Sequence, residues 1–151
     1  MIDIVTDKVF IDSNLWLYAL AKHPPSGDVR HEQAMRVILS LENPVISTQV
    51  IREVGRNLLK KQKISEDELC GYIQDWHNEC EVVTPNLTQE LTASKLRVNH
   101  CLSYWDSLIV SAALNTHCRW LYSEDMQHGL VIENCLTIIN PFTLLASNQV
   151  S

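Results

Sequence analysis

The fold is decided by the stretch Val9-Phe10-Ile11-Asp12-Ser13-Asn14-Leu15-Trp16, an apolar run that ends abruptly in an acid and then continues as a helix-like pattern. The β-branched and aromatic residues at its start predict a strand that is buried on both faces. The residues that follow, 15–20, favour helix. Asp12 is therefore predicted at the carboxyl end of a strand. In open α/β sheets, ligands bind at this edge.

The rest of the chain alternates helical patterns with short apolar strands. We expect helices from residue 13 to about 21 and over about 29–40, 48–61, 65–79, 87–98 and 103–114, and strands at 45–47, 81–84, 120–122 and 136–139. Thr48 and Ser65 are the expected N-caps of two of these helices. Strands that alternate with helices predict an α/β fold, here a three-layer sandwich with a five-stranded, mainly parallel central sheet. We expect a single domain over residues 1–151.

Size, charge and cysteine content narrow the class of protein. A chain of 151 residues that is 46% hydrophobic can bury a sizeable core. A net charge of −6 argues against a general nucleic-acid-coating surface, because Lys and Arg supply most non-specific affinity for phosphate. Five cysteines without a C-x-x-C pair predict reduced, mostly buried thiols in a cytoplasmic protein. No apolar run reaches the length of about 20 residues that a membrane span needs.

Four acids fall at comparable places in the predicted topology. Asp12 follows the first strand, Glu53 lies in the helix after the second, Asp106 begins the apolar helix, and Asp125 follows the fourth strand. In a parallel sheet, all four lie at the carboxyl-end edge. Each also has an ordinary structural explanation, since the three aspartates are common cap or turn residues and the glutamate could form ion pairs on its helix. Four acids on one edge are harder to explain as four unrelated caps.

Five short motifs occur along the chain. They are FIDSN at residues 10–14, VIREV at 50–54, YWDSLIVSAA at 104–113, LYSEDMQHG at 121–129 and TIINPF at 137–142. In this order and spacing, the chain resembles the PIN-domain nucleases, particularly the VapC-like toxins of bacterial type II toxin–antitoxin pairs. One departure is mild: the family often has Thr after its first acid, where this chain has Ser13.

The resemblance implies a metal-dependent endoribonuclease. Its catalytic residues and ligands for one or two Mg²⁺ or Mn²⁺ ions would be Asp12, Glu53, Asp106 and Asp125. Asn14 is expected to support the metal or its waters, and Ser123 stands where the family carries Thr or Ser beside its last acid. A carboxylate-held ion acidifies a water that can attack phosphorus, and the family reaction leaves a 5′-phosphate and a 3′-hydroxyl.

The resemblance also implies three partners: an RNA substrate, a cognate antitoxin that covers the active-site groove, and a second copy of the chain in a homodimer. Arg52, Arg56 and Lys60 recur every fourth position and are candidate RNA contacts, although a solvated helix face is the slightly favoured explanation. The sequence assigns no role to Glu124, and it predicts only loop structure for His128.

Two other classes of function stay open. One is a catalytically silent PIN-like module that binds RNA or protein. The other is a phosphatase with Asp12 as the nucleophile, against which Asn14 counts because it occupies the place of a second acid. Cleavage of RNA in the presence of Mg²⁺ separates the nuclease from both.

Overall fold

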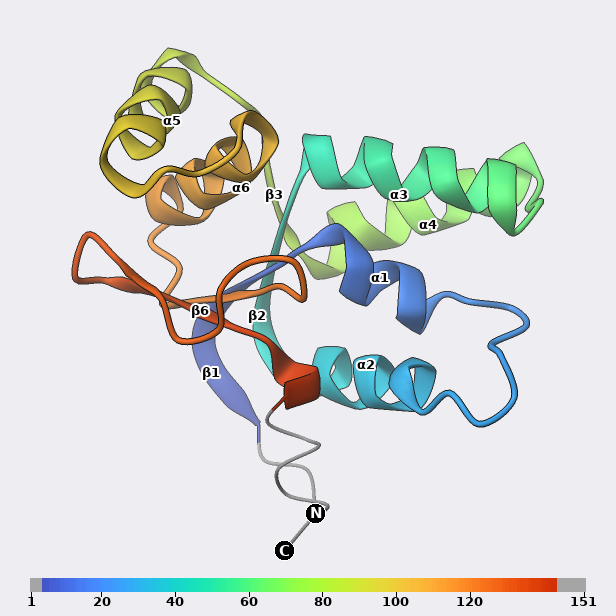
Figure 1. Cartoon of the computed structure of the whole chain (residues 1–151). Coiled ribbons are helices and arrows are strands. Elements are labelled where there is room, and N and C mark those ends of the chain that lie inside the picture. The colour runs from blue at the N-terminus through green and yellow to red at the C-terminus, as the bar shows by residue number, and fades with distance from the viewer. Residues whose placement is uncertain (1–3, 144–151) are drawn as a thin grey trace, which may run out of the picture.

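The computed structural model describes residues 4–143 and is built around one mixed sheet (Figure 1). In these residues the sheet has six strands in the order β3-β2-β1-β4-β6-β5. The strands are β1 (Val5–Ile11), β2 (Leu41–Ser47), β3 (Glu81–Val83), β4 (Trp120–Tyr122), β5 (Val131–Ile132) and β6 (Leu136–Ile139). The helices are α1 (Ser13–Ala19), α2 (Arg30–Leu39), α3 (Thr48–Lys61), α4 (Glu66–Glu79), α5 (Leu87–His100) and α6 (Tyr104–Asn115).

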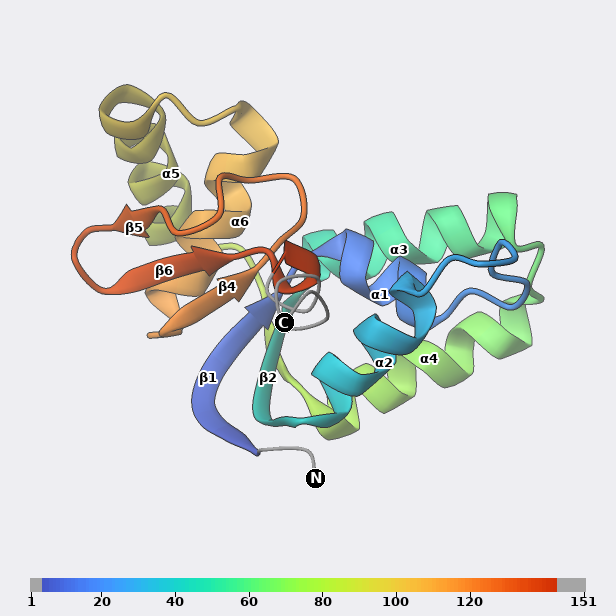
Figure 2. The ribbon, with the colours of Figure 1, turned by 60° about the horizontal axis from the view of Figure 1, so that its bottom comes forward.

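The sheet is covered by helices on both faces, as the predicted three-layer α/β fold requires. Helices α1 to α4 lie on one side of it and α5 and α6 on the other (Figure 2). The cause is the strand order: the chain moves outward from β1 to β2 and β3, then returns past β1 to β4. Right-handed crossovers in opposite directions place their helices on opposite faces.

The prediction of five strands is wrong by one, because β5 forms an edge strand antiparallel to β6. This hairpin turns at Glu133 and Asn134, which both have positive φ, and the Cys135 N–H donates to the Ile132 carbonyl at 3.1 Å. Such turns usually contain Asn-Gly or Asp-Gly. A Glu-Asn turn and a two-residue strand are too weak a sequence pattern to predict this hairpin. The other neighbouring strand pairs are all parallel.

The second strand begins earlier than its sequence suggests. Helix α2 ends at Leu39 and β2 already begins at Leu41, so Pro44 lies inside a strand and not at a helix end. Pro44 is paired only with Val9 of β1, since pairing with β3 starts at Val45. A residue without an N–H is tolerated there because one side of the strand is still an edge.

Of the two predicted N-caps, Ser65 is confirmed and Thr48 is wrong by one residue. Ser65 and Glu68 form a complete capping box at the start of α4. Helix α3 is capped by Ser47, whose side chain accepts a hydrogen bond from the Val50 N–H, and Thr48 is its first helical residue. Either hydroxyl suits an N-cap, so the sequence alone does not separate the two.

The prediction of mostly buried thiols is wrong for three of the five cysteines. Cys70, Cys101 and Cys135 are exposed, Cys80 is half-buried and Cys118 is buried. Burial raises the pKa of the Cys80 and Cys118 thiols to about 11, so both stay protonated near neutral pH. Over residues 4–143, none of the helices has the length and apolar character needed to cross a membrane.

Candidate active site

The site begins where β1 and β4 end side by side. Asp12 follows β1 and Ser123 follows β4, and the Asp12 N–H donates to the Tyr122 carbonyl at 3.0 Å. Between these strands the topology reverses, since β1 leads to one side of the sheet and β4 is reached from β3 on that side. A crevice at such a switch point is the usual ligand position in an open α/β sheet.

Asp12 is held by hydrogen bonds to both carboxylate oxygens. Oδ1 accepts from the Ser13 N–H at 2.7 Å, and Oδ2 accepts from the Ser123 hydroxyl at 2.9 Å. Asp12 is thus the N-cap of α1, as its ordinary explanation required. A cap alone does not explain why a carboxylate is only 7% exposed and is fixed from a second strand.

Glu53 reaches the same site from α3. The buried Ser13 hydroxyl donates to Glu53 Oε2 at 2.8 Å, while the Ser13 N–H bonds to Asp12. Ser13 therefore bridges two of the four acids. No ion pair joins Glu53 to a basic residue within the described range, which removes the ordinary explanation offered for it.

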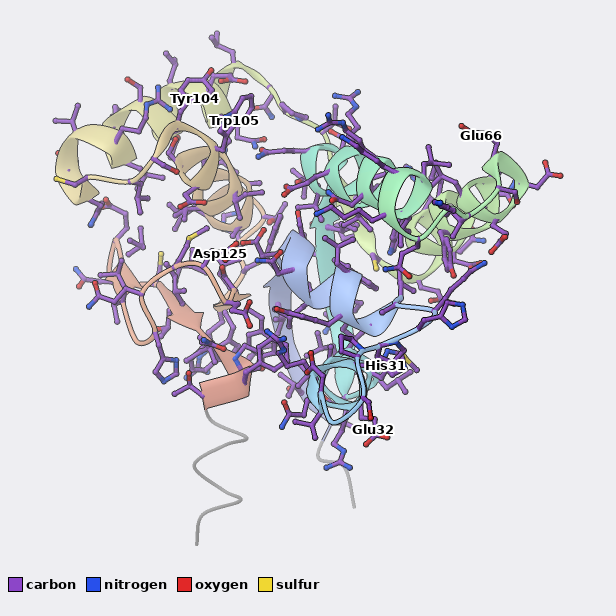
Figure 3. The ribbon with its side chains drawn as sticks, turned by 45° about the vertical axis from the view of Figure 1, so that its right-hand side comes forward. His31, Glu32, Glu66, Tyr104, Trp105 and Asp125 are labelled. Carbon is purple, nitrogen blue, oxygen red and sulfur yellow. The ribbon has the colours of Figure 1, made fainter. Side chains whose placement is uncertain are left out.

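Asp125 lies near the start of α1 (Figure 3). Its Oδ2 accepts a hydrogen bond from Asn14 Nδ2 at 2.6 Å, and its N–H donates to the Ser123 hydroxyl at 3.2 Å. Ser123 consequently contacts both Asp12 and Asp125. Asn14 and Ser13 are adjacent residues of α1 that hold acids from different parts of the chain.

Glu124 is held by other groups. Its Oε1 accepts a hydrogen bond from the Tyr18 hydroxyl at 2.9 Å, and Arg30 lies 4.0 Å from its other oxygen. Arg30 also pairs with Asp28 at 2.7 Å. These contacts tie the loop that bears Asp125 to α1 and α2, so Glu124 anchors the loop.

Asp106 lies in the first turn of α6. Its N–H donates to the Ser103 hydroxyl at 3.2 Å, and Ser103 is the N-cap of α6. The carboxylate still acts on the site, because its charge contributes to raising the pKa of Asp125. The structure therefore places Asp106 within electrostatic reach of an acid that follows β4.

Two of the four acids, Asp12 and Asp125, have a raised pKa. The pKa of Asp12 is raised to about 6: burial is the largest cause, the hydrogen bonds from Ser13 and Ser123 oppose it, and the charges of Glu53 and Asp125 add to it. Burial also raises the pKa of Asp125, with contributions from Glu124, Asp106 and Glu53, while the Asn14 hydrogen bond lowers it. A buried acid with a raised pKa beside other acids is typical of functional sites.

This crowding predicts a pH dependence of stability. The Asp12 pKa is higher in the folded protein than in the unfolded chain, so protonated Asp12 favours the folded state. This contribution to the free energy of unfolding is fully present below about pH 4 and is lost as pH rises through 6. We expect the metal-free protein to lose on the order of 3 kcal/mol of unfolding free energy between these limits. Urea titrations at pH 4.5 and 7.5 should capture about 2 kcal/mol of this loss, because pH 4.5 already lies above the ordinary pKa of Asp. An Asp12→Asn variant that shows the same loss contradicts the assignment.

The donor set suits a hard divalent cation, although it is not closed around one. Mg²⁺ and Mn²⁺ prefer carboxylate oxygens, which these residues supply. Within residues 4–143, no group of three or more His, Cys, Asp or Glu side chains could hold an ion as it stands. Hydrogen bonds from Ser13, Asn14 and Ser123 occupy carboxylate oxygens instead.

The predicted basic stripe lies beside the site and not in it. Arg52, Arg56 and Lys60 are exposed and line a groove of about 550 Å³ between α3 and α4. Its floor is apolar, with Leu69 of α4 close to Gly55 of α3. Glu53 lies on α3, the same helix that carries the three basic residues, so the stripe lies next to this acid.

Sequence reasoning missed two contacts. The sequence marks Ser13 only as a departure from the family pattern, although its hydroxyl donates to Glu53; a small polar residue beside a buried acid is the available signal. Tyr18 was not singled out, and only the fold brings it to Glu124. His128 has the structural role predicted for it, since its Nδ1 accepts from the Asn140 N–H at 2.9 Å.

Comparisons with known proteins agree with this fold. The PIN domain family model matches residues 9–129. The fold is similar to that of Mycobacterium tuberculosis VapC20, a sarcin-ricin loop cleaving toxin, with a TM-score of 0.60, 19% identity, and coverage of 78% of this chain and 89% of that one. A toxin–antitoxin complex from Klebsiella pneumoniae gives a TM-score of 0.65 at 14% identity, with 88% and 97% covered.

A third similar structure is Rickettsia felis VapBC2 bound to a DNA fragment from its promoter. It gives a TM-score of 0.60 at 18% identity and covers 88% of this chain and 99% of that one. No curated protein matches the sequence. At these identities the structural matches establish the fold alone.

Proposed function

The chain belongs to the PIN-domain family, and from that premise we propose that it is a metal-dependent endoribonuclease, the toxin of a type II toxin–antitoxin pair. One observation supports this most strongly. Asp12 is buried at the switch point of the sheet, and the charges of Glu53 and Asp125 act on it there. An uncompensated cluster of this kind is costly to keep, and a divalent cation would relieve it.

In this proposal the ligands and catalytic residues are the four acids that follow or flank the central strands: Asp12, Glu53, Asp106 and Asp125. Mg²⁺ or Mn²⁺, when bound, supplies an acidified water and neutralises charge that develops on the phosphate. Ser13 and Ser123 orient the carboxylates of Glu53 and Asp12, and Asn14 orients that of Asp125. Groups that fix ligands in this way tune both affinity and geometry.

The proposed partners are an RNA substrate, a cognate antitoxin and a second copy of the chain, in the cytoplasm. Two similar structures are toxin–antitoxin assemblies, which supports the antitoxin. The local negative charge suits a basic side chain inserted by that partner.

The decisive experiment uses the chain purified free of any antitoxin. Total cellular RNA is incubated with it in Mg²⁺, in Mn²⁺ and in EDTA, beside Asp12→Asn protein prepared identically. Fragments that require metal and appear only with the native protein support the proposal. Equal fragments from both proteins indicate a contaminating nuclease, and intact RNA under every condition contradicts the proposal.

A silent binding module is the second candidate. The observation that favours it is the lack, among residues 4–143, of three side chains already placed to hold an ion. This alternative predicts binding of RNA without cleavage in either metal. Retarded but uncut RNA in the same incubations would establish it.

The basic stripe gives a separate prediction about RNA affinity. Replacing Arg56 and Lys60 together by Gln should weaken RNA binding and lower the slope of log affinity against log salt by roughly 0.7 for each phosphate that is no longer neutralised. Fluorescence anisotropy at several salt concentrations measures this. Arg36→Gln with Lys95→Gln is the charge-matched control, on the exposed surfaces of α2 and α5. An unchanged slope would discard the stripe as an RNA-binding surface.

A further inference from the structure

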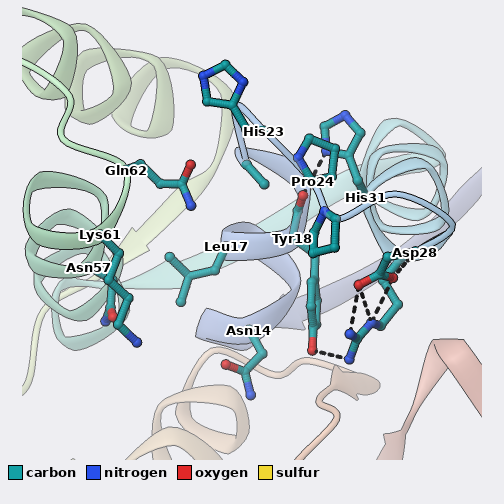
Figure 4. A pocket seen from close by; sticks show the side chains of 13 residues that line it. Asn14, Leu17, Tyr18, His23, Pro24, Asp28, His31, Asn57, Lys61 and Gln62 are labelled. Carbon is teal, nitrogen blue, oxygen red and sulfur yellow. Dashed lines mark hydrogen bonds and ion pairs between the residues drawn. The ribbon is translucent and has the colours of Figure 1, made fainter.

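A pocket of about 310 Å³ opens directly beside the acids, between α1, the end of α3 and the segment that joins α1 to α2 (Figure 4). Asn14 lies on its rim, and the Asn14 amide is also the group that donates to Asp125 at 2.6 Å. A chain of nucleotides with one phosphate at the acids could therefore place a neighbouring base in the pocket. The acids alone offer no such surface, because carboxylates bind a cation and reach a phosphate only through it.

One wall of the pocket is polar, and its hydrogen-bonding capacity can be assigned. Asn57 Nδ2 donates to the Glu53 carbonyl at 2.9 Å, which leaves Oδ1 as an acceptor. Gln62 Oε1 accepts from the Lys22 N–H at 3.2 Å, which leaves Nε2 as a donor. Lys61 adds a cationic donor on the same wall, where Figure 4 shows it beside Asn57. The wall thus offers one acceptor and two donors.

The remaining walls are mostly apolar or already satisfied. Leu17 rises in the middle of the pocket, and Pro24 lies across from Lys61 (Figure 4). One face of the Tyr18 ring is already covered, because the Arg30 guanidinium lies 4.6 Å from its centre. His31 uses Nδ1 at 2.8 Å from the Tyr18 carbonyl. A flat ring would therefore pack against aliphatic side chains and present its edge to the polar wall.

We propose that this pocket binds the base of a nucleotide next to the cleaved bond and selects guanine, an inference that rests on the proposed nuclease function. Guanine presents O6 and N7 acceptors, the commonest partners of a basic side chain, and these match Lys61 and Gln62. Its N1–H and N2–H donors match Asn57 Oδ1. Adenine and cytosine offer an amino group where Lys61 requires an acceptor. Uracil offers O4 and N3–H but has no N7, so it leaves the Gln62 donor without a partner.

The first test measures binding without cleavage. Guanosine, adenosine, cytidine and uridine 5′-monophosphates are titrated in turn into metal-free, ¹⁵N-labelled protein. We expect guanosine monophosphate to shift the side-chain amide signals of Asn57 and Gln62 and to bind about tenfold more tightly than the other three. Lys61→Met should abolish the preference and Lys61→Arg should keep it. Lys95→Met, on the exposed surface of α5, is the matched control.

Equal shifts with all four nucleotides would show recognition of phosphate alone and overturn the proposal, as would the absence of shifts. If no nucleotide binds but Lys61→Met weakens the antitoxin complex, the pocket serves the protein partner and the proposal fails.

The second test uses single-turnover cleavage of RNAs that differ only in the nucleotide on either side of the cut. RNAs with guanine at one of these positions should be cleaved about tenfold faster by the native protein and at equal rates by Lys61→Met. Cleavage that ignores the base overturns the pocket and leaves the nuclease intact. If no RNA is cleaved, the nuclease function fails, and the nucleotide titrations still decide what the pocket binds.

Discussion

Replacing Asp12 with Asn should lower the rate of metal-dependent RNA cleavage by at least about a thousandfold while leaving the protein folded. Outer groups that merely support a metal ligand are worth about 10–100-fold, so loss of the central ligand should cost more. Asn keeps the shape of Asp12: its oxygen can still accept from the Ser13 N–H, and its amide can donate to the Ser123 hydroxyl. Only the charge and one ligand oxygen are removed.

The same change should not destabilise the metal-free protein at neutral pH. Burial and the charges of Glu53 and Asp125 oppose ionisation of Asp12, so a neutral amide removes that penalty. Thermal unfolding in EDTA should give a Tm equal to or above that of the native chain, and Mn²⁺ should raise the Tm of the native chain alone.

Two controls make this result specific. Asp75→Asn introduces the same chemical change at an exposed position of α4 and should leave both cleavage and Tm unchanged. Glu124→Gln removes an acid next to Asp125 that is already held by Tyr18, so it should reduce cleavage far less than Asp12→Asn. An Asp12→Asn protein that is folded and cleaves within tenfold of the native rate would refute the metal-centred site.

The parts of the site that sequence predicts best are those set by strand ends. Asp12 and Asp125 directly follow or nearly follow apolar strands, so their edge of the sheet could be inferred from a buried run that stops at a polar residue. Glu53 and Asp106 lie in helices, where the shared edge of the sheet and the family resemblance, and not their local sequence, separate them from ordinary surface or cap acids. Their electrostatic effects on Asp12 and Asp125 are consistent with that interpretation.

What sequence could not supply is contact between distant segments. The Tyr18 hydroxyl reaches Glu124 across 106 positions of the chain, and Asn14 reaches Asp125 across 111. No regular spacing in the sequence predicts either pair, because each contact depends on how far a loop folds back over α1. The pocket beside Asn14 depends in the same way on the path between α1 and α2. The missed strand β5 has a different cause, since its hairpin uses Glu133 and Asn134 where glycine is usual.

Replacing Phe10 with Ala should destabilise the fold by about 3–5 kcal/mol, the cost of a large cavity in a rigid core. Phe10 is fully buried and lies in the central strand β1, where its register partners are Val45 of β2 and Leu121 of β4. Its neighbours are themselves fixed by pairing in the sheet, so they cannot collapse into the space. Urea denaturation in metal-free buffer measures the loss directly.

The position of Phe10, two residues before Asp12, links this stability to the site. The strands that Phe10 and Leu121 hold together end in Asp12 and Ser123, whose hydrogen bond spans β1 and β4. We therefore expect cleavage to fall in parallel with the folded fraction as urea is added. Leu39→Ala, at a side chain that is 73% exposed, should change stability by less than about 0.5 kcal/mol. Equal losses from both substitutions would mean that β1 is not the centre of the core.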